Sequence, residues 1–170
     1  MARRILAASA LIVCLAFTVA SARADADKFL LISFDEFFTG DTTIDGTTTV
    51  SGAFSDKGAR HQDNTILSVS SDGTQVVVTG TVTINGSKGI LTTQYTGTIQ
   101  FDATNIAYIR GTEVITGGTG LYAGAKGSGT FEATLDFDTG NIRGTAEFTS
   151  HKINRPVTRT LSVPAKAARD

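Results

Sequence analysis

The stretch that decides the fold is residues 91–101, which reads Leu-Thr-Thr-Gln-Tyr-Thr-Gly-Thr-Ile-Gln-Phe. Its odd positions are mostly apolar, aromatic or glycine, whereas its even positions are all threonine or glutamine. A period of two places alternate residues on opposite faces of a β-strand. One apolar face and one threonine-rich face are typical of an antiparallel sheet with one side in water.

The same alternation continues on both sides of this stretch, over residues 76–84, 131–138 and 142–149. No segment after residue 24 has a helical period. We expect eight strands, at residues 28–38, 47–54, 64–70, 75–84, 88–101, 105–116, 127–137 and 141–150. The expected tight turns contain Asp45-Gly46, Asp72-Gly73, Asn85-Gly86 and Thr139-Gly140-Asn141.

Eight antiparallel strands without helices form either a sandwich or a closed barrel. The short connections between the alternating segments favour a meander in which each strand pairs with the next. Glycines on the apolar face let coiled strands bend and approach one another, and four occur at Gly80, Gly97, Gly111 and Gly144. We therefore predict an all-β fold, an eight-stranded antiparallel up-and-down barrel.

Composition and charge narrow the class of protein. The chain has 170 residues, suited to one domain, and it includes 27 threonines and 18 glycines. Its 15 basic and 16 acidic residues give a net charge of −1. Residues 25–151, the predicted barrel domain, hold seven basic and 15 acidic residues, a net charge of −8. A nucleic-acid-binding domain needs a basic face, so we expect no nucleic-acid partner.

Residues 1–24 have the features of a secretory signal peptide. Arg3 and Arg4 precede an uncharged apolar stretch, and Ala22-Arg23-Ala24 is a small-x-small cleavage site. The alternative is a membrane anchor, but about 15 apolar residues are fewer than the roughly 20 that span a bilayer. We expect cleavage near Ala24, a secreted or periplasmic protein, and no membrane span. The only cysteine, Cys14, would leave with the signal peptide.

Residues 152–170 form a basic C-terminal tail with five basic residues and one acidic residue. This tail is either a solvated terminus or a segment that docks on the acidic body or on another anionic surface. Residues 157–163 are apolar enough to form a ninth strand instead.

The most distinctive segment is residues 115–131, which reads ITGGTGLYAGAKGSGTF. Its glycines permit a tight turn with positive φ as one strand leaves the barrel, and the structural turn residues are Gly117, Gly118, Gly120 and Gly124. Leu121 and Tyr122 would then cap the barrel end. A nucleotide-binding interpretation fails, because the glycine spacing is wrong and no helix follows.

This segment resembles the GGTG-aromatic-x-G-A-x-G hairpin of the allene oxide cyclase barrel and dirigent proteins, and especially of small secreted bacterial proteins with that barrel. The resemblance is sharp over residues 105–150 and diffuse over residues 28–104. It implies an eight-stranded antiparallel barrel and a homo-oligomer, a trimer in the plant members. It also implies an interior that holds a cyclase site or guides radical coupling. The plant cyclases have Glu and Asn two apart near the first strand, whereas residues 33–36 here read Ser-Phe-Asp-Glu, so their catalytic residues do not carry over.

Two expected strands, 28–38 and 105–116, carry a charged residue on each face, so an inward charge is unavoidable in both. A charge inside a barrel must be paired, neutral or close to the wet mouth. The structural interpretation is therefore a rim charge or an internal ion pair. The functional interpretation assigns ligand contacts to five candidate residues, Glu36, Tyr95, Tyr108, Arg110 and Glu113.

Each of these side chains has a chemical role in the functional interpretation. Glu36 or Glu113 would be a general acid or base, Arg110 would hold an anion, and the two tyrosine hydroxyls would orient the ligand. The only histidines, His61 and His151, lie far apart in the sequence and outside any metal-binding motif. We expect no metal and no cofactor.

Three functions are compatible with this sequence. The first is a secreted, non-catalytic barrel that binds one small apolar ligand in its interior. The second is an isomerase, a cyclase or a dirigent-like guide for a hydrophobic substrate. The third is a structural or interaction barrel with a filled interior. An apolar ligand would require one continuous cavity lined by Tyr95, Phe101, Phe131, Leu135 and Phe148. An empty interior would separate the first two functions from the third.

Overall fold

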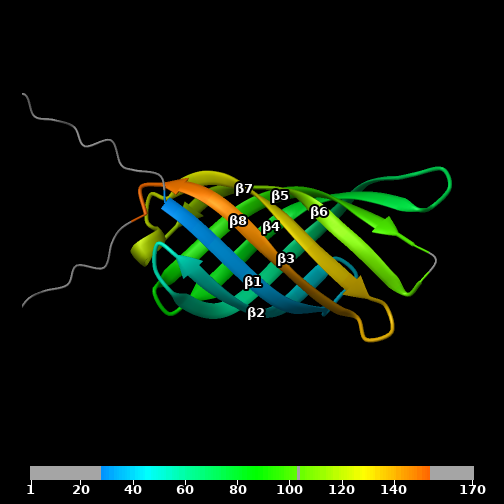
Figure 1. Ribbon diagram of the computed structural model, residues 1–170, viewed down its shortest axis with the longest axis horizontal. Coiled ribbons are helices and arrows are strands. Elements are labelled where there is room, and N and C mark those ends of the chain that lie inside the picture. Colours follow the sequence, from blue (N-terminus) through cyan, green and yellow to red (C-terminus); the bar gives the residue numbers. More distant parts are fainter. Residues whose placement is uncertain (1–27, 103, 154–170) are drawn as a thin grey trace, which may run out of the picture.

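Each alternating stretch of the sequence forms a strand in the computed structural model, which describes residues 28–102 and 104–153 (Figure 1). The strands are β1 Lys28–Phe38, β2 Thr43–Gly52, β3 Asp56–Val69, β4 Gln75–Gly86, β5 Gly89–Phe101, β6 Ile106–Gly118, β7 Lys126–Asp136 and β8 Asn141–His151. Each strand pairs with the next in antiparallel fashion, and β8 pairs with β1 to close the barrel. The predicted eight-stranded up-and-down barrel is confirmed. The predicted signal peptide and a ninth strand at 157–163 lie outside the described residues.

The prediction was wrong on the limits of β2 and β3. β2 begins four residues earlier than expected, and β3 begins eight residues earlier. Asp45-Gly46 does not form a turn, because Gly46 lies within β2 between Glu36 and Arg60 of the neighbouring strands. A Cβ at Gly46 would lie 2.2 Å from the Asp35 carbonyl oxygen. Glycine is therefore needed at this position because β1 and β2 approach closely there.

Two of the other expected turns are found where the dipeptides placed them. Gly73 and Gly140 have φ values of 71° and 68° in the β3–β4 and β7–β8 connections. The predicted turn at Asn85-Gly86 was wrong. Both residues pair with β5, and the turn lies at Ser87 and Lys88.

The inward glycines make room for aromatic rings. A Cβ at Gly97 or at Gly111 would lie within 2.8 Å of the Phe131 ring. Phe131 therefore lies over two glycines on neighbouring strands, and its ring meets the Tyr95 ring edge-on at 5.6 Å. This arrangement lets the strands coil tightly while the Phe131 ring covers the two glycines.

One end of the barrel is closed by a plug between β6 and β7. A short 3₁₀ helix, η1 Gly120–Tyr122, turns the chain there, at the left in Figure 1. The Tyr122 side chain is fully buried, packs 5.1 Å from the Phe54 ring and donates a hydrogen bond to the Asp56 carboxylate. Burial alone would raise the pKa of Asp56, but hydrogen bonds to its carboxylate hold the pKa below its usual value. The donors are the Ser87 and Tyr122 hydroxyls and the backbone N–H groups of Lys57 and Lys88.

The glycines of the predicted turn take different positions. Gly120 and Gly124 have φ values of 58° and 73°, whereas Gly117 and Gly118 are the last two residues of β6. A Cβ at Gly120 would also lie 2.2 Å from the carbonyl oxygen of Lys88. Gly120 therefore needs to be glycine for both its φ and its contact with the β4–β5 turn.

Candidate functional site

A cavity of about 230 Å³ occupies the half of the barrel opposite the η1 plug. Its wall is mostly apolar and comes from all eight strands of the barrel. The apolar lining residues include Phe34, Val78, Ile99, Phe131, Ala133 and Leu135. These side chains point inward because every second residue of a strand faces the interior. The wall is therefore suited to the apolar part of a small ligand.

Apolar side chains also surround the mouth of this cavity. Phe38, Ile66 and Phe137 belong to the lining, and 47%, 64% and 49% of their surfaces are exposed. They lie at or beside strand ends on the side of the β1–β2, β3–β4 and β7–β8 connections. An apolar molecule entering here would meet an apolar surface before the interior.

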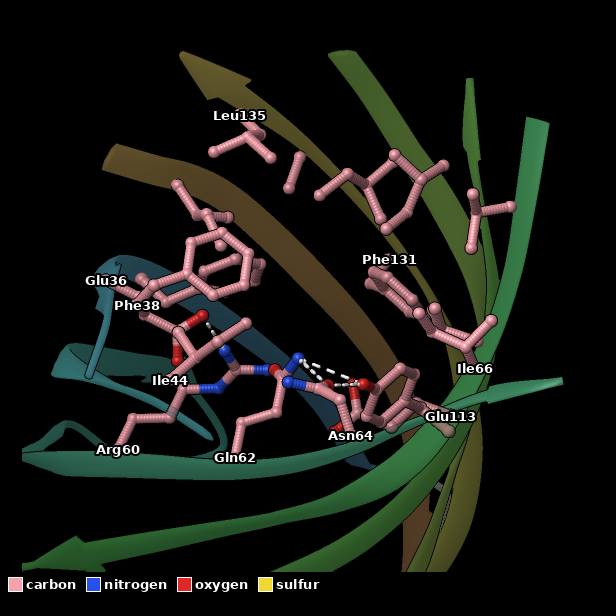
Figure 2. Close-up of a pocket in the computed structure, with 18 of the residues that line it drawn as sticks. Glu36, Phe38, Ile44, Arg60, Gln62, Asn64, Ile66, Glu113, Phe131 and Leu135 are labelled. Atoms are coloured by element: carbon pink, nitrogen blue, oxygen red, sulfur yellow. Dashed lines mark hydrogen bonds and ion pairs between the residues drawn. The ribbon is translucent and has the colours of Figure 1, made fainter. Parts of the chain in front are cut away.

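Polar side chains gather deeper in the cavity (Figure 2). β3 supplies three of them, Arg60, Gln62 and Asn64, because alternate residues of this strand face inward. β1 supplies Glu36, and β6 supplies Glu113. The cavity thus combines an apolar wall with an ionisable floor.

Glu36 and Arg60 form an ion pair inside the barrel. Only 1% of Glu36 and 5% of Arg60 is exposed, and the guanidinium lies 4.1 Å above the centre of the Phe34 ring. The second carboxylate oxygen, Glu36 Oε1, is buried and has no hydrogen-bond partner among the described residues. Burial raises the pKa of Glu36, although the charge of Arg60 partly offsets this.

Glu113 is a second buried carboxyl group at the floor, with 3% of its surface exposed. The Thr93 hydroxyl donates a hydrogen bond to its Oε1. Within the described part of the chain Glu113 makes no ion pair, since Arg60 is engaged by Glu36. Burial raises the pKa of Glu113, and the nearby charge of Arg60 lowers it only in part. Of the two floor carboxyls, Glu113 is the one whose ionised form has no ion pair to stabilise it among the described residues.

Tyr95 joins the floor through a small network of hydrogen bonds. Gln62 Nε2 donates to Asn64 Oδ1 at 2.7 Å and to the Tyr95 hydroxyl oxygen at 3.0 Å, and that hydroxyl donates to Asn64 Oδ1. Burial raises the pKa of Tyr95 far above its usual value, so the phenol stays neutral. The network links Tyr95 to Gln62 and Asn64, which lie beside each other in Figure 2.

The structure brings three of the five predicted ligand-binding residues together and separates the other two. Glu36, Tyr95 and Glu113 line the cavity. Tyr108 and Arg110 lie on the outer face of β6, where both are exposed, because the register of β6 turns the face of Ala107 and Glu113 inward. The prediction that Tyr108 and Arg110 contact a ligand therefore does not hold for this cavity, whose lining includes neither residue. Phe148 was also expected to line the cavity, but it is buried outside the lining.

Arg60, Gln62 and Asn64 were not predicted from the sequence. The first two precede residue 64, where the strand was expected to begin, and Asn64 is the first residue of that expected strand. The inward face of β3 is polar here, so the apolar alternation that marked the other strands is absent. One signal in the sequence could have identified them. A buried Glu36 or Glu113 requires a cation nearby. Arg60 is a basic residue that would share one strand face with Gln62 and Asn64, because the three are alternate residues.

No protein-family model, curated protein or solved structure matches this chain. In the described residues no group of three or more His, Cys, Asp or Glu side chains is placed to hold a metal ion. The same part of the chain contains no helix that is long and apolar enough to cross a bilayer.

Proposed function

We propose that this chain is a secreted or periplasmic, non-catalytic barrel of the allene oxide cyclase-like and dirigent-like type that binds one small, largely apolar ligand. The observation that carries the proposal is the apolar cavity of about 230 Å³ in one half of the barrel. Cavities of about 150 Å³ take benzene, and drug-sized ligands occupy about 300 Å³ or more. The expected ligand therefore has one or two rings or an equivalent short chain.

The two ends of the barrel support binding from one side. The Tyr122 plug closes one end with buried, hydrogen-bonded side chains. The opposite end has exposed Phe38, Ile66 and Phe137 around the cavity. A filled structural barrel needs no such cavity, because well-packed interiors leave few voids larger than a water molecule. The family resemblance and a trimeric state stay predictions.

A second candidate function is an isomerase or cyclase, or a guide for a reactive hydrophobic substrate. The observation that favours it is Glu113, a buried carboxyl that borders the cavity and whose pKa is raised by burial. A neutral carboxyl beside a bound substrate is placed to donate a proton. The proposed function and this candidate differ only in whether the bound molecule changes.

Native mass spectrometry of the protein purified from its own source tests the proposed function. We expect a mass excess of one small molecule, which is lost on unfolding. A bare protein mass, together with no uptake of an environment-sensitive apolar dye, would contradict ligand binding. If a molecule is identified, incubation with the protein separates the two functions. Recovery of the unchanged molecule supports a binder, whereas conversion that Glu113→Gln abolishes supports the enzyme.

A further inference from the structure

The charges at the cavity floor are unequal. Two carboxyl groups, Glu36 and Glu113, share the interior with one guanidinium, that of Arg60. All three are at most 5% exposed, so water screens them little. With both carboxyls ionised the floor would carry one excess negative charge. A proton on one carboxyl, or a cation from outside, is required to balance it.

One acceptor at this floor also lacks a donor. Glu36 Oε1 is buried, belongs to a residue that lines the cavity and accepts no hydrogen bond from any described residue. Buried polar atoms in proteins nearly always have a partner, and a bound ligand is one source of it. The missing group is a hydrogen-bond donor, because a carboxylate oxygen can only accept.

We propose that the cavity takes a small apolar molecule ending in a protonated amine, and that the ammonium group replaces the proton held by Glu113. This inference rests on the proposed function and specifies its ligand class. The ammonium N–H groups donate to the Glu113 carboxylate, and Glu36 Oε1 is a second acceptor on a residue of the same lining that has no donor among the described residues. The Glu113 proton passes to solvent, so one proton is released for each ammonium bound and no covalent bond of the ligand changes.

The neighbouring charged groups are consistent with this exchange. Arg60 on β3 is ion-paired through Nη1 with the other oxygen of Glu36 on β1, and this Nη1 makes no further hydrogen bond with the described residues. Tyr95 on β5 stays neutral, since burial raises its pKa. On β2, Asp45 adds a weak repulsion toward the Glu36 carboxylate. An anion would meet two carboxyls here, whereas a neutral alcohol would satisfy Glu36 Oε1 but leave Glu113 protonated.

Isothermal titration calorimetry at about pH 6 with three probes of matched size tests the ligand class. The probes are benzylamine, benzyl alcohol and benzoate, each titrated in two buffers of different ionisation enthalpy. We expect benzylamine to bind about ten- to a hundredfold more tightly than benzyl alcohol, because hydrogen bonds between charged groups are the stronger kind. We expect benzylamine binding to release protons and benzyl alcohol binding to release none. Benzoate should bind most weakly.

Two variants test whether Glu113 is the source of the released proton and of the preference for benzylamine. Glu113→Gln keeps an oxygen for the Thr93 hydroxyl but removes the exchangeable proton, so it should abolish proton release and most of the preference for benzylamine. Glu132→Gln removes an exposed carboxylate on the outer face of β7 and should change neither. Circular dichroism melts check that both variants fold, and proton release by the unmodified protein is decisive by itself.

The outcomes distinguish this inference from the proposed function. Equal affinity for benzylamine and benzyl alcohol, or benzylamine binding without proton release, would overturn the ammonium inference while apolar binding stands. Failure of all three probes and of an apolar dye to bind would overturn the proposed function itself.

Discussion

At the scale of single residues, one buried basic side chain holds the charged part of the barrel interior together. Arg60 is the only buried basic residue in the described part of the chain, and it pairs with Glu36 while lying over the Phe34 ring. A buried ion pair is weak evidence for stability, because both ions lose their hydration. The loss of one partner is costly, however, since it leaves an unpaired charge in the interior.

We predict that Arg60→Met destabilises the barrel by about 3–5 kcal/mol near neutral pH. The double variant Glu36→Gln/Arg60→Met should recover most of this loss, because neither charge then remains. Urea denaturation of the three proteins measures both effects. Arg110→Met on the outer face of β6 is the matched control and should change stability by less than about 0.5 kcal/mol. A double variant as unstable as the single one would contradict the pairing.

The raised pKa of Glu113 predicts an unusual pH dependence of stability. Because the folded state holds this proton more tightly than the unfolded state, the contribution of Glu113 falls as pH rises from its ordinary value of 4.5 through the raised pKa. The unfolding free energy of the wild type minus that of Glu113→Gln should therefore fall with rising pH across this window, because the glutamine has no proton to lose. Urea denaturation at several pH values measures it. A difference that grows with pH would show that Glu113 is stabilised as the ionised carboxylate.

At the scale of elements, the β6–β7 connection depends on one glycine. Gly120→Val should lower the melting temperature clearly, since valine tolerates positive φ poorly, at a cost of about 1–3 kcal/mol, and would also meet the Lys88 carbonyl oxygen. Gly117→Val is the matched control, because a Cβ there has no neighbour within 4 Å. Thermal unfolding followed by circular dichroism compares the two. Equal melting temperatures for Gly120→Val and the wild type would contradict the described turn.

The strands differ in how far the sequence predicts them. β1 was predicted with its observed limits, and β4, β5, β7 and β8 within two residues, because apolar and polar residues alternate along them. β3 was predicted at only half its length, since its inward residues Arg60, Gln62 and Asn64 are themselves polar. The polar half of β3 is also where the candidate site lies. The alternation that identifies a strand is interrupted where polar residues line the cavity.

The orientation of β6 shows a second limit of the sequence. Both of its faces contain apolar and charged residues, so the sequence does not decide whether Glu113 or Arg110 faces inward. The barrel decides it through register, because Gly111 must lie beside Gly97 under the Phe131 ring. This contact joins three strands and is not visible in any one segment. Tyr108 and Arg110 are outward as a consequence.

At the scale of the whole molecule, export is a prediction from residues 1–24. Arg3, Arg4, the apolar stretch and Ala22-Arg23-Ala24 predict cleavage after Ala24. N-terminal sequencing of the exported protein should start at Asp25. A membrane-bound product that retains Met1 would contradict the signal peptide.

The proposed function requires that the barrel interior is an accessible cavity for an apolar ligand. Its wall includes Ala133 on β7, whose side chain borders both the cavity and Gly144. A phenylalanine at residue 133 would occupy the cavity. Because the space exists already, its cost should stay below the roughly 1–3 kcal/mol of an overpacked core. Ala59→Phe, on the exposed outer face of β3, is the matched control.

The most direct test is fluorescence titration of an environment-sensitive apolar dye against the wild type, Ala133→Phe and Ala59→Phe. We expect saturable uptake by the wild type and by Ala59→Phe, and none by Ala133→Phe, with the same β-sheet circular dichroism in all three. No uptake by the wild type, together with a clear loss of stability in Ala133→Phe, would mean that the barrel is solid and would contradict the proposed function.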